Sequence, residues 1–103
     1  MKIKYENGNI YEGQFRNGEP DGRGKMIYAD GNIYEGEMHR GQPSGEGRMT
    51  YVSGNKYEGS WLDGRRHGKG RMSYANGDVY IGVWIDDEPR GIGTMTLTNG
   101  DKI

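Results

Sequence analysis

The strongest constraint on the fold of this chain is a repeat of 23 residues. The letters GNIYEG stand at positions 8–13 and again at 31–36, and GNKYEG and GDVYIG follow at 54–59 and 77–82. All twenty glycines fall into five phases of this period, and all eight tyrosines fall into two. The period therefore indicates one structural unit copied along the chain, in which each glycine and each tyrosine has a fixed role.

We interpret residues 1–103 as a single array, since a chain of this length is expected to form one domain. Its units are a partial one at 1–7, four repeats at about 8–30, 31–53, 54–76 and 77–99, and a partial one at 100–103. With 31% hydrophobic residues the chain lacks the apolar content for a thick two-layer core. Because Ile103 stands in a tyrosine phase, the chain stops inside a fifth unit, which indicates truncation or strand pairing between molecules.

Each unit contains two segments that alternate and carry β-forming residues, as in GRGKMIY and NIYEGEM. A short turn such as ADG or ANG joins them, and the other connection, RNGEPDG or HRGQPSG, reads as longer and rich in turn residues. This predicts about nine antiparallel strands. A three-residue turn that ends in a left-handed glycine fixes the register. The predicted cross-strand pairs are Tyr28 with Asn32, Met26 with Tyr34, and Gly24 with Gly36.

This register collects the tyrosines and methionines on one face, with glycines between them. The same face receives Phe15, Met38, Trp61 and Trp84. Because glycine has no side chain, we expect each of these glycines to leave room for a neighbouring aromatic ring to lie flat across the strand. The opposite face carries alternating charges, Glu12, Glu35 and Glu58 near Lys25, Arg48 and Arg71. Asp87 replaces the glycine found at 18, 41 and 64, and we expect the turn to survive, because Asp tolerates left-handed backbone.

In the unit pattern, YEG is followed by a hydrophobic residue, by spaced glycines and then by MxY. Over essentially the whole chain this pattern resembles the MORN (membrane occupation and recognition nexus) repeat. The resemblance implies an all-β fold, an elongated, single-layer, twisted antiparallel sheet of β-hairpin repeats. It also implies a non-enzymatic scaffold or adaptor, because arrays of this family bind protein partners along an aromatic groove, self-associate and in some cases bind phospholipid.

The aromatic stripe is the candidate groove for a partner peptide or helix, although its rings could simply pack on one another. The candidate residues are Tyr11, Tyr28, Tyr34, Tyr51, Tyr57, Trp61, Tyr74, Tyr80 and Trp84. Because nothing covers the face of a single-layer sheet, an exposed aromatic strip is expected there. We expect parts of five of these residues to remain accessible, namely Tyr28, Tyr51, Tyr74, Trp61 and Trp84.

The last unit departs from the others by turning its second face apolar. The residues concerned are Val79, Ile81, Val83, Ile85 and Ile92, at positions that are mostly polar in earlier units. Terminal repeats are normally more polar outside than this. Something is therefore expected to cover this face: a second copy of the chain, a downstream helix or a partner. Of these, we favour the homodimer.

A basic segment, RRHGKGR, supplies the alternative function, binding of anionic phospholipid through Arg65, Arg66, Lys69 and Arg71. The competing interpretation is an ordinary solvated loop, and the acidic DDE segment at 86–88 partly cancels its charge. The formal net charge of −1 gives no general attraction to nucleic acid, and none is expected as a partner.

No motif predicts an enzyme, a cofactor or a metal site. The Gly-rich GRGK recurs in every unit, unlike a phosphate-binding loop, and Asp30 has Asn7, Ser53 and Asn76 as its equivalents, a poor set of calcium ligands. The chain has no cysteine, and its first ten residues contain no apolar run of the kind found in signal peptides. We expect a cytoplasmic protein, with a peripheral site at a membrane or the cytoskeleton as the alternative.

Overall fold

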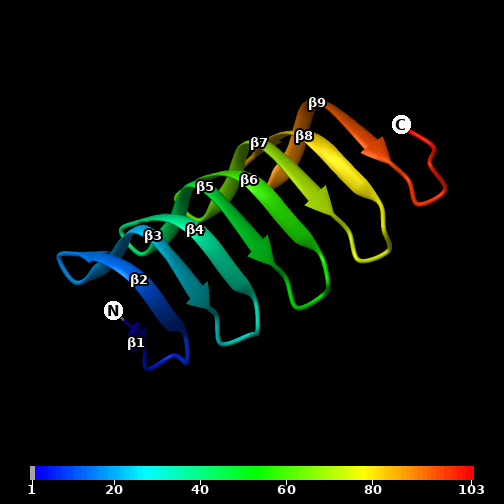
Figure 1. The fold of residues 1–103 in the computed structure, drawn as a ribbon. Coiled ribbons are helices and arrows are strands. Elements are labelled where there is room, and N and C mark those ends of the chain that lie inside the picture. Colours follow the sequence, from blue (N-terminus) through cyan, green and yellow to red (C-terminus); the bar gives the residue numbers. More distant parts are fainter. Residues whose placement is uncertain (1) are drawn as a thin grey trace.

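The computed structural model describes residues 2–103, which form one open sheet of nine antiparallel strands in sequential order (Figure 1). The strands are β1 (Lys2–Lys4), β2 (Ile10–Arg16), β3 (Glu19–Ile27), β4 (Ile33–His39), β5 (Gln42–Thr50), β6 (Lys56–Leu62), β7 (Arg65–Ser73), β8 (Val79–Ile85) and β9 (Glu88–Thr96). The sheet measures 46 × 23 × 17 Å. The expected all-β, single-layer, elongated architecture is therefore confirmed.

The predicted register of the three-residue turn is also confirmed. Gly24 lies opposite Gly36 and Met26 opposite Tyr34, while the backbone N–H of Tyr28 donates to the Asn32 carbonyl at 2.9 Å. The glycine that closes this turn, Gly31, has φ = 101°, a left-handed conformation that costs glycine little. The same turn geometry recurs in each unit.

The other connection was predicted wrongly, because it is the shorter of the two. Arg16 pairs with Glu19, so only Asn17 and Gly18 form the loop, with φ values of 52° and 80°. Two consecutive left-handed residues are the mark of a type I′ hairpin turn, whose twist matches that of the strands. Most of the segment read as a loop belongs to β3, and the bulge between Gly13 and Phe15 absorbs the change of register. At the corresponding turn Asp87 has φ = 72°, so the turn survives this substitution, as expected.

A continuous row of glycines crosses the sheet from β2 to β9. The paired residues are Gly13, Gly24, Gly36, Gly47, Gly59, Gly70, Gly82 and Gly93. A Cβ atom at Gly47 would overlap the ring of Tyr34, and the same relation holds for Gly24 and Tyr11 and for Gly70 and Tyr57. The prediction that the glycines make room for the aromatic rings is thereby confirmed.

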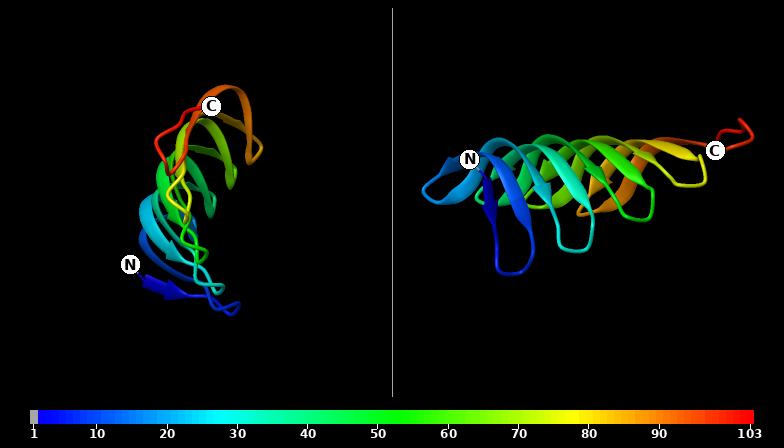
Figure 2. Two further views of the ribbon diagram at one scale, coloured as in Figure 1. Left: turned by 90° about the vertical axis from the view of Figure 1, so that its right-hand side faces the viewer. Right: turned by 60° about the horizontal axis from the view of Figure 1, so that its bottom comes forward.

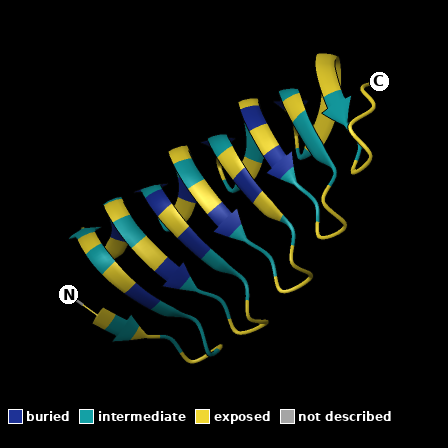
Figure 3. Cartoon of the chain, turned by 45° about the vertical axis from the view of Figure 1, so that its right-hand side comes forward, coloured by how far each residue is buried: buried dark blue, intermediate teal, exposed yellow. Residues whose placement is uncertain are grey.

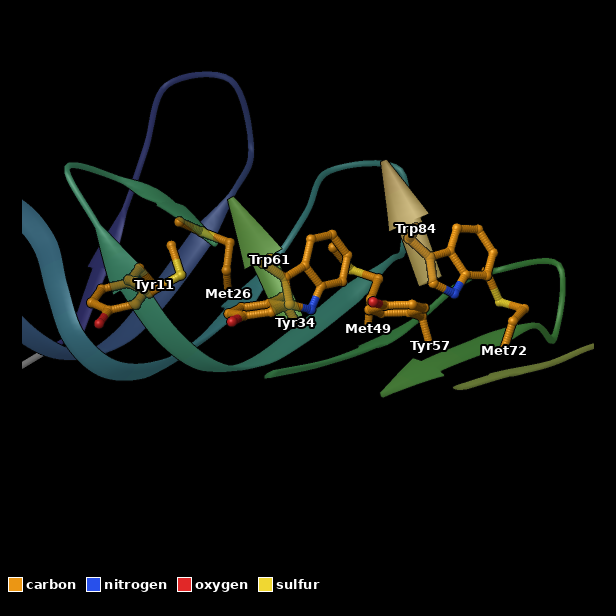
Figure 4. Packing of buried hydrophobic residues seen from close by; sticks show 9 residues of the cluster. Tyr11, Met26, Tyr34, Met49, Tyr57, Trp61, Met72 and Trp84 are labelled. Atoms are coloured by element: carbon orange, nitrogen blue, oxygen red, sulfur yellow. The ribbon is translucent and has the colours of Figure 1, made fainter. Parts of the chain in front are cut away.

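The core is a single file of rings and thioethers (Figure 4). Its buried positions recur from strand to strand along the sheet (Figure 3). Its buried members are Tyr11, Met26, Tyr34, Met38, Met49, Tyr57, Trp61, Met72 and Trp84. The strands bend around this file, as the view along the array shows (Figure 2, left), so the sheet has a concave face and a convex face. The bending explains how one layer of strands can bury rings completely.

Candidate functional site

The concave face carries a groove that runs along the array between the two sets of turns. In the first repeat a pocket of about 220 Å³ is lined by Tyr5, Asn7, Asn9, Pro20, Met26 and Gly41. In the second repeat a larger pocket of about 410 Å³ is lined by Tyr28, Asp30, Asn32, Gly41, Gln42, Pro43, Met49 and Gly64. We call the latter the Tyr28 pocket. The residues that line the two pockets are at equivalent positions, one 23-residue period apart. The groove therefore repeats along the array and is not a single isolated pocket.

The predicted groove residues divide into two sets. Tyr28, Tyr51, Tyr74 and Tyr80 are half-buried, whereas Tyr11, Tyr34, Tyr57, Trp61 and Trp84 are buried. The expectation that Trp61 and Trp84 stay accessible was wrong, since their exposed fractions are 5% and 2%. Their burial follows from the curvature of the sheet and from edge-to-face packing, in which Tyr57 lies between Trp61 at 5.1 Å and Trp84 at 5.3 Å.

The hydroxyls of three buried tyrosines are bound by backbone carbonyls of their own strands. Tyr11 donates to the Gln14 carbonyl at 2.9 Å, Tyr34 donates to that of Glu37 at 2.7 Å, and Tyr57 to that of Ser60 at 3.0 Å. These bonds hold each ring across the strand and satisfy a polar group that burial would otherwise leave unpaired.

Burial of these phenols predicts a loss of stability at high pH. Burial raises the pKa of Tyr57 from 10.0 to about 12, although the nearby Arg66 charge acts in the opposite direction. Because the folded state holds this proton more tightly than the unfolded state, the stabilisation is complete below pH 10 and is lost as the pH rises toward about 12. Urea unfolding at about pH 9 and about pH 11 should show a lower free energy of unfolding at the higher pH. A Tyr57→Phe variant should show a smaller loss between these two pH values, and an equal loss in both proteins would contradict this assignment.

The third repeat differs from the first two, because a side chain fills its part of the groove. Arg66 stands where the other units have Pro20, Pro43 and Pro89, and its guanidinium carbon lies 4.9 Å from the Trp84 ring centre and 5.7 Å from that of Tyr51. The Arg66 Nε and backbone N–H both donate to Asp87 Oδ1, at 3.1 and 2.8 Å, and Nη2 donates to the Asp87 carbonyl at 3.0 Å.

The replacement of the usual glycine by Asp87 was predicted to preserve the turn, but the link between Asp87 and Arg66 was not predicted. The sequence contains a sign of this link, because Arg66 and Asp87 both depart from the repeat. Their positions belong to adjacent turns of the same groove. Gly41 donates its N–H to the Pro20 carbonyl and Gly64 donates to that of Pro43, and Asp87 donates in the same way to Arg66 at 3.0 Å. Two departures at positions joined in every repeat indicate a compensating pair.

The four basic residues proposed for lipid binding do not share one face. Arg66 pairs in register with Trp61 and lies in the groove. Lys69 and Arg71 lie on the opposite side of β7 from its buried residues and are exposed on the convex face. Arg65 is exposed and lies 3.7 Å from Asp86. The positive charge of this segment is thus divided between the two faces and partly neutralised by its acidic neighbours.

The convex face of the last repeat exposes apolar side chains. The exposed fractions are 57% for Ile81, 43% for Ile85 and 90% for Ile92, while Val79 and Val83 are half-buried. Farther back along the sheet the convex face is charged, and Glu35 lies in register between Lys25 and Arg48. The contrast in polarity that the sequence predicts for this unit is present on the surface.

Within residues 2–103, no group of His, Asp and Glu side chains is close enough together to hold a metal ion. The same part of the chain contains no helix with the length and apolar character needed to cross a membrane.

Comparison with known families identifies the repeat. The model of the MORN repeat matches the chain four times in succession, at residues 11–33, 34–56, 57–79 and 80–102. No curated protein matches the chain. Repeats of this family are in general modules that bind proteins or membranes, and the family is not an enzymatic one. The four consecutive matches span nearly the whole sheet, and the chain belongs to the MORN repeat family.

Proposed function

We propose that this chain is a non-enzymatic scaffold or adaptor that docks a peptide or helix of a partner protein in the groove of its concave face. The observation that carries the proposal is the succession of two open pockets on equivalent positions, lined by half-buried tyrosines and by asparagine and glutamine side chains. Aromatic rings combined with polar hydrogen-bonding groups are the usual composition of a surface that recognises a peptide. The family's general role as a binding module agrees with this use.

Site-specific photo-cross-linking tests the proposal, because it reports which face a partner touches. Gln42 lines the Tyr28 pocket and is exposed, so a benzophenone side chain there should disturb the fold little. Lys69 is exposed on the convex face and gives the matched control position. In native lysate we expect a discrete protein adduct from position 42 that persists at high salt, and no adduct of the same mass from position 69. Adducts of equal yield from both positions would contradict docking in the groove.

Binding to anionic phospholipid is the competing outcome and requires its own measurement. Vesicles that contain phosphatidylserine should be bound in a salt-dependent way if the basic residues are responsible. The informative variant combines Arg65→Ala, Lys69→Ala and Arg71→Ala, all exposed, and leaves Arg66 in its groove contacts. Loss of vesicle binding in this variant, together with no adduct from position 42, would replace the protein-docking proposal by the lipid one.

The exposed isoleucines of the last repeat support a homodimer as part of the same proposal. Ile81 and Ile92 form an apolar surface on the convex face, where burial against a second copy would be favourable. We expect the chain to sediment as a dimer at high concentration and the Ile81→Glu, Val83→Thr variant to sediment as a folded monomer. A wild-type chain that stays monomeric at high concentration would exclude this contact.

A further inference from the structure

The Tyr28 pocket corresponds in position to the space that the Arg66 side chain fills in the third repeat. The ring frame is conserved between the two repeats, with Tyr34 and Trp61 at 5.5 Å and 82° in one and Tyr57 and Trp84 at 5.3 Å and 83° in the other. In the third repeat the Arg66 guanidinium carbon lies 4.9 Å from the Trp84 ring centre and 5.7 Å from that of Tyr51, and the side chain is only 21% exposed. In the second repeat Pro43 occupies that position, and its short ring leaves the 410 Å³ pocket beside Tyr28.

The charge of the Tyr28 pocket favours the same kind of occupant. Asp30, exposed at the pocket lip, is the one acid at a position held elsewhere by Asn7, Ser53 and Asn76. It accepts hydrogen bonds from the backbone and side chain of Asn32, at 3.1 and 3.4 Å, and within residues 2–103 no Lys, Arg or His forms an ion pair with it. The pocket lining contains no cation. A carboxylate beside an aromatic ring is the environment that a guanidinium prefers.

The field of this carboxylate reaches the ring itself. The pKa of Tyr28 is raised to about 12, first by burial and then by the negative charge of Asp30. In the third repeat the carboxylate comes from Asp87, on the side of the two-residue turns, whereas Asp30 lies in a three-residue turn on the other side of the groove. The second repeat therefore offers the equivalent ring and a carboxylate of its own on the opposite side of the groove, but no arginine.

We propose that the Tyr28 pocket binds an arginine side chain of a partner protein, with the guanidinium stacked on Tyr28 and paired with the Asp30 carboxylate. Arg66 is the internal counterpart of that ligand. The inference rests on the proposed docking of a protein segment in the groove and adds the chemistry of one of its contacts. Arginine is expected to bind more tightly than lysine, because a planar guanidinium can stack on the ring while it donates to the carboxylate.

The direct test uses a blocked tripeptide, acetyl-Gly-Arg-Gly-amide, and its citrulline analogue, which has nearly the same shape but no charge. Binding is followed by nuclear magnetic resonance shifts of Tyr28 and Asn32. We expect saturable binding of the arginine peptide, and affinity lower by at least about tenfold for the citrulline peptide. Asp30→Asn should cause a similar loss; Asp30 is exposed, so this variant should fold normally. Equal binding of the two peptides by the wild-type protein would overturn the proposal.

The repeat also supplies two matched double variants. Pro43→Arg with Gly64→Asp transplants the Arg66–Asp87 pair into the second repeat and should abolish peptide binding by filling the pocket. Arg66→Pro with Asp87→Gly opens the third repeat, where Ser53 stands in place of Asp30, and should change the affinity of the Tyr28 pocket by less than about twofold. Undiminished binding to the folded, filled variant would overturn the proposal. If that variant does not fold, the Asp30→Asn comparison decides.

The arginine inference and the docking proposal can fail separately. A protein adduct from position 42 that forms equally well with wild type and with Asp30→Asn, while neither peptide binds, would leave the docking proposal standing and remove the arginine contact. Absence of any adduct from position 42 contradicts the docking proposal itself. Loss of that adduct in Asp30→Asn would support both.

Discussion

Replacing Gly47 with alanine is expected to lower the free energy of unfolding by about 2–4 kcal/mol, a large effect for a single methyl group. The added Cβ would overlap the hydroxyl end of the Tyr34 ring, which lies across this glycine. Tyr34 is fully buried and its hydroxyl is held by the Glu37 carbonyl, so the ring can move only by giving up that bond and its packing. Urea denaturation at neutral pH measures the change.

Gly18→Ala provides the control for this prediction. Gly18 has φ = 80° and open space around its Cβ position, so alanine there meets only the backbone cost of the left-handed conformation, about 1 kcal/mol. Gly47, in contrast, has no left-handed φ, and its substitution isolates the steric effect of the ring. Gly47→Ala that proves no more destabilising than Gly18→Ala would mean that the ring does not need the room that the glycine leaves.

The fold could be predicted from the sequence because the same pattern recurs in every repeat, which resolves strand and turn assignments that one segment alone would leave open. A single Tyr or Gly predicts little, but Tyr28 and its equivalents fix which residues must face one another, and only the three-residue turn gathers all the rings on one side. The two-residue turn was misjudged because EPDG contains Pro and Gly, residues typical of loops, whereas Pro20 lies in β3 and pairs with Phe15. A bulge within the hairpin gives such residues a place in a strand.

The site was less predictable, because it depends on curvature that the pattern of side chains does not encode. The sequence places Trp61 and Trp84 on the aromatic face, but whether a ring on that face is open or covered depends on how sharply the strands bend. The sequence shows Arg66 and Asp87 as two departures from the repeat, but their contact with each other required the geometry, as did the position of the Asp30 carboxylate in the groove. Only the structure shows that residues of both kinds of turn line the same pocket on the concave face.

Tyr57 provides the test of how the repeats are joined, and Tyr57→Ala is expected to cost about 3–5 kcal/mol. Its ring is fully buried and contacts Trp61 of its own hairpin and Trp84 of the next repeat, with planes at 86° and 83°. In an array where each unit contacts mainly its neighbours, removing such a link weakens the coupling between the two halves as well as the repeat itself. The unfolding transition in urea should therefore become broader as well as earlier.

Two phenylalanine variants separate the ring from its hydroxyl. Tyr57→Phe keeps the packing but loses the bond to the Ser60 carbonyl, at a cost of about 1 kcal/mol. Tyr80→Phe is the matched control: Tyr80 holds the equivalent position, yet within residues 2–103 its hydroxyl makes no hydrogen bond, so the change should be close to zero. If Tyr57→Ala costs no more than Tyr57→Phe, the file of rings does not connect the repeats, and their coupling must come from the backbone ladder alone.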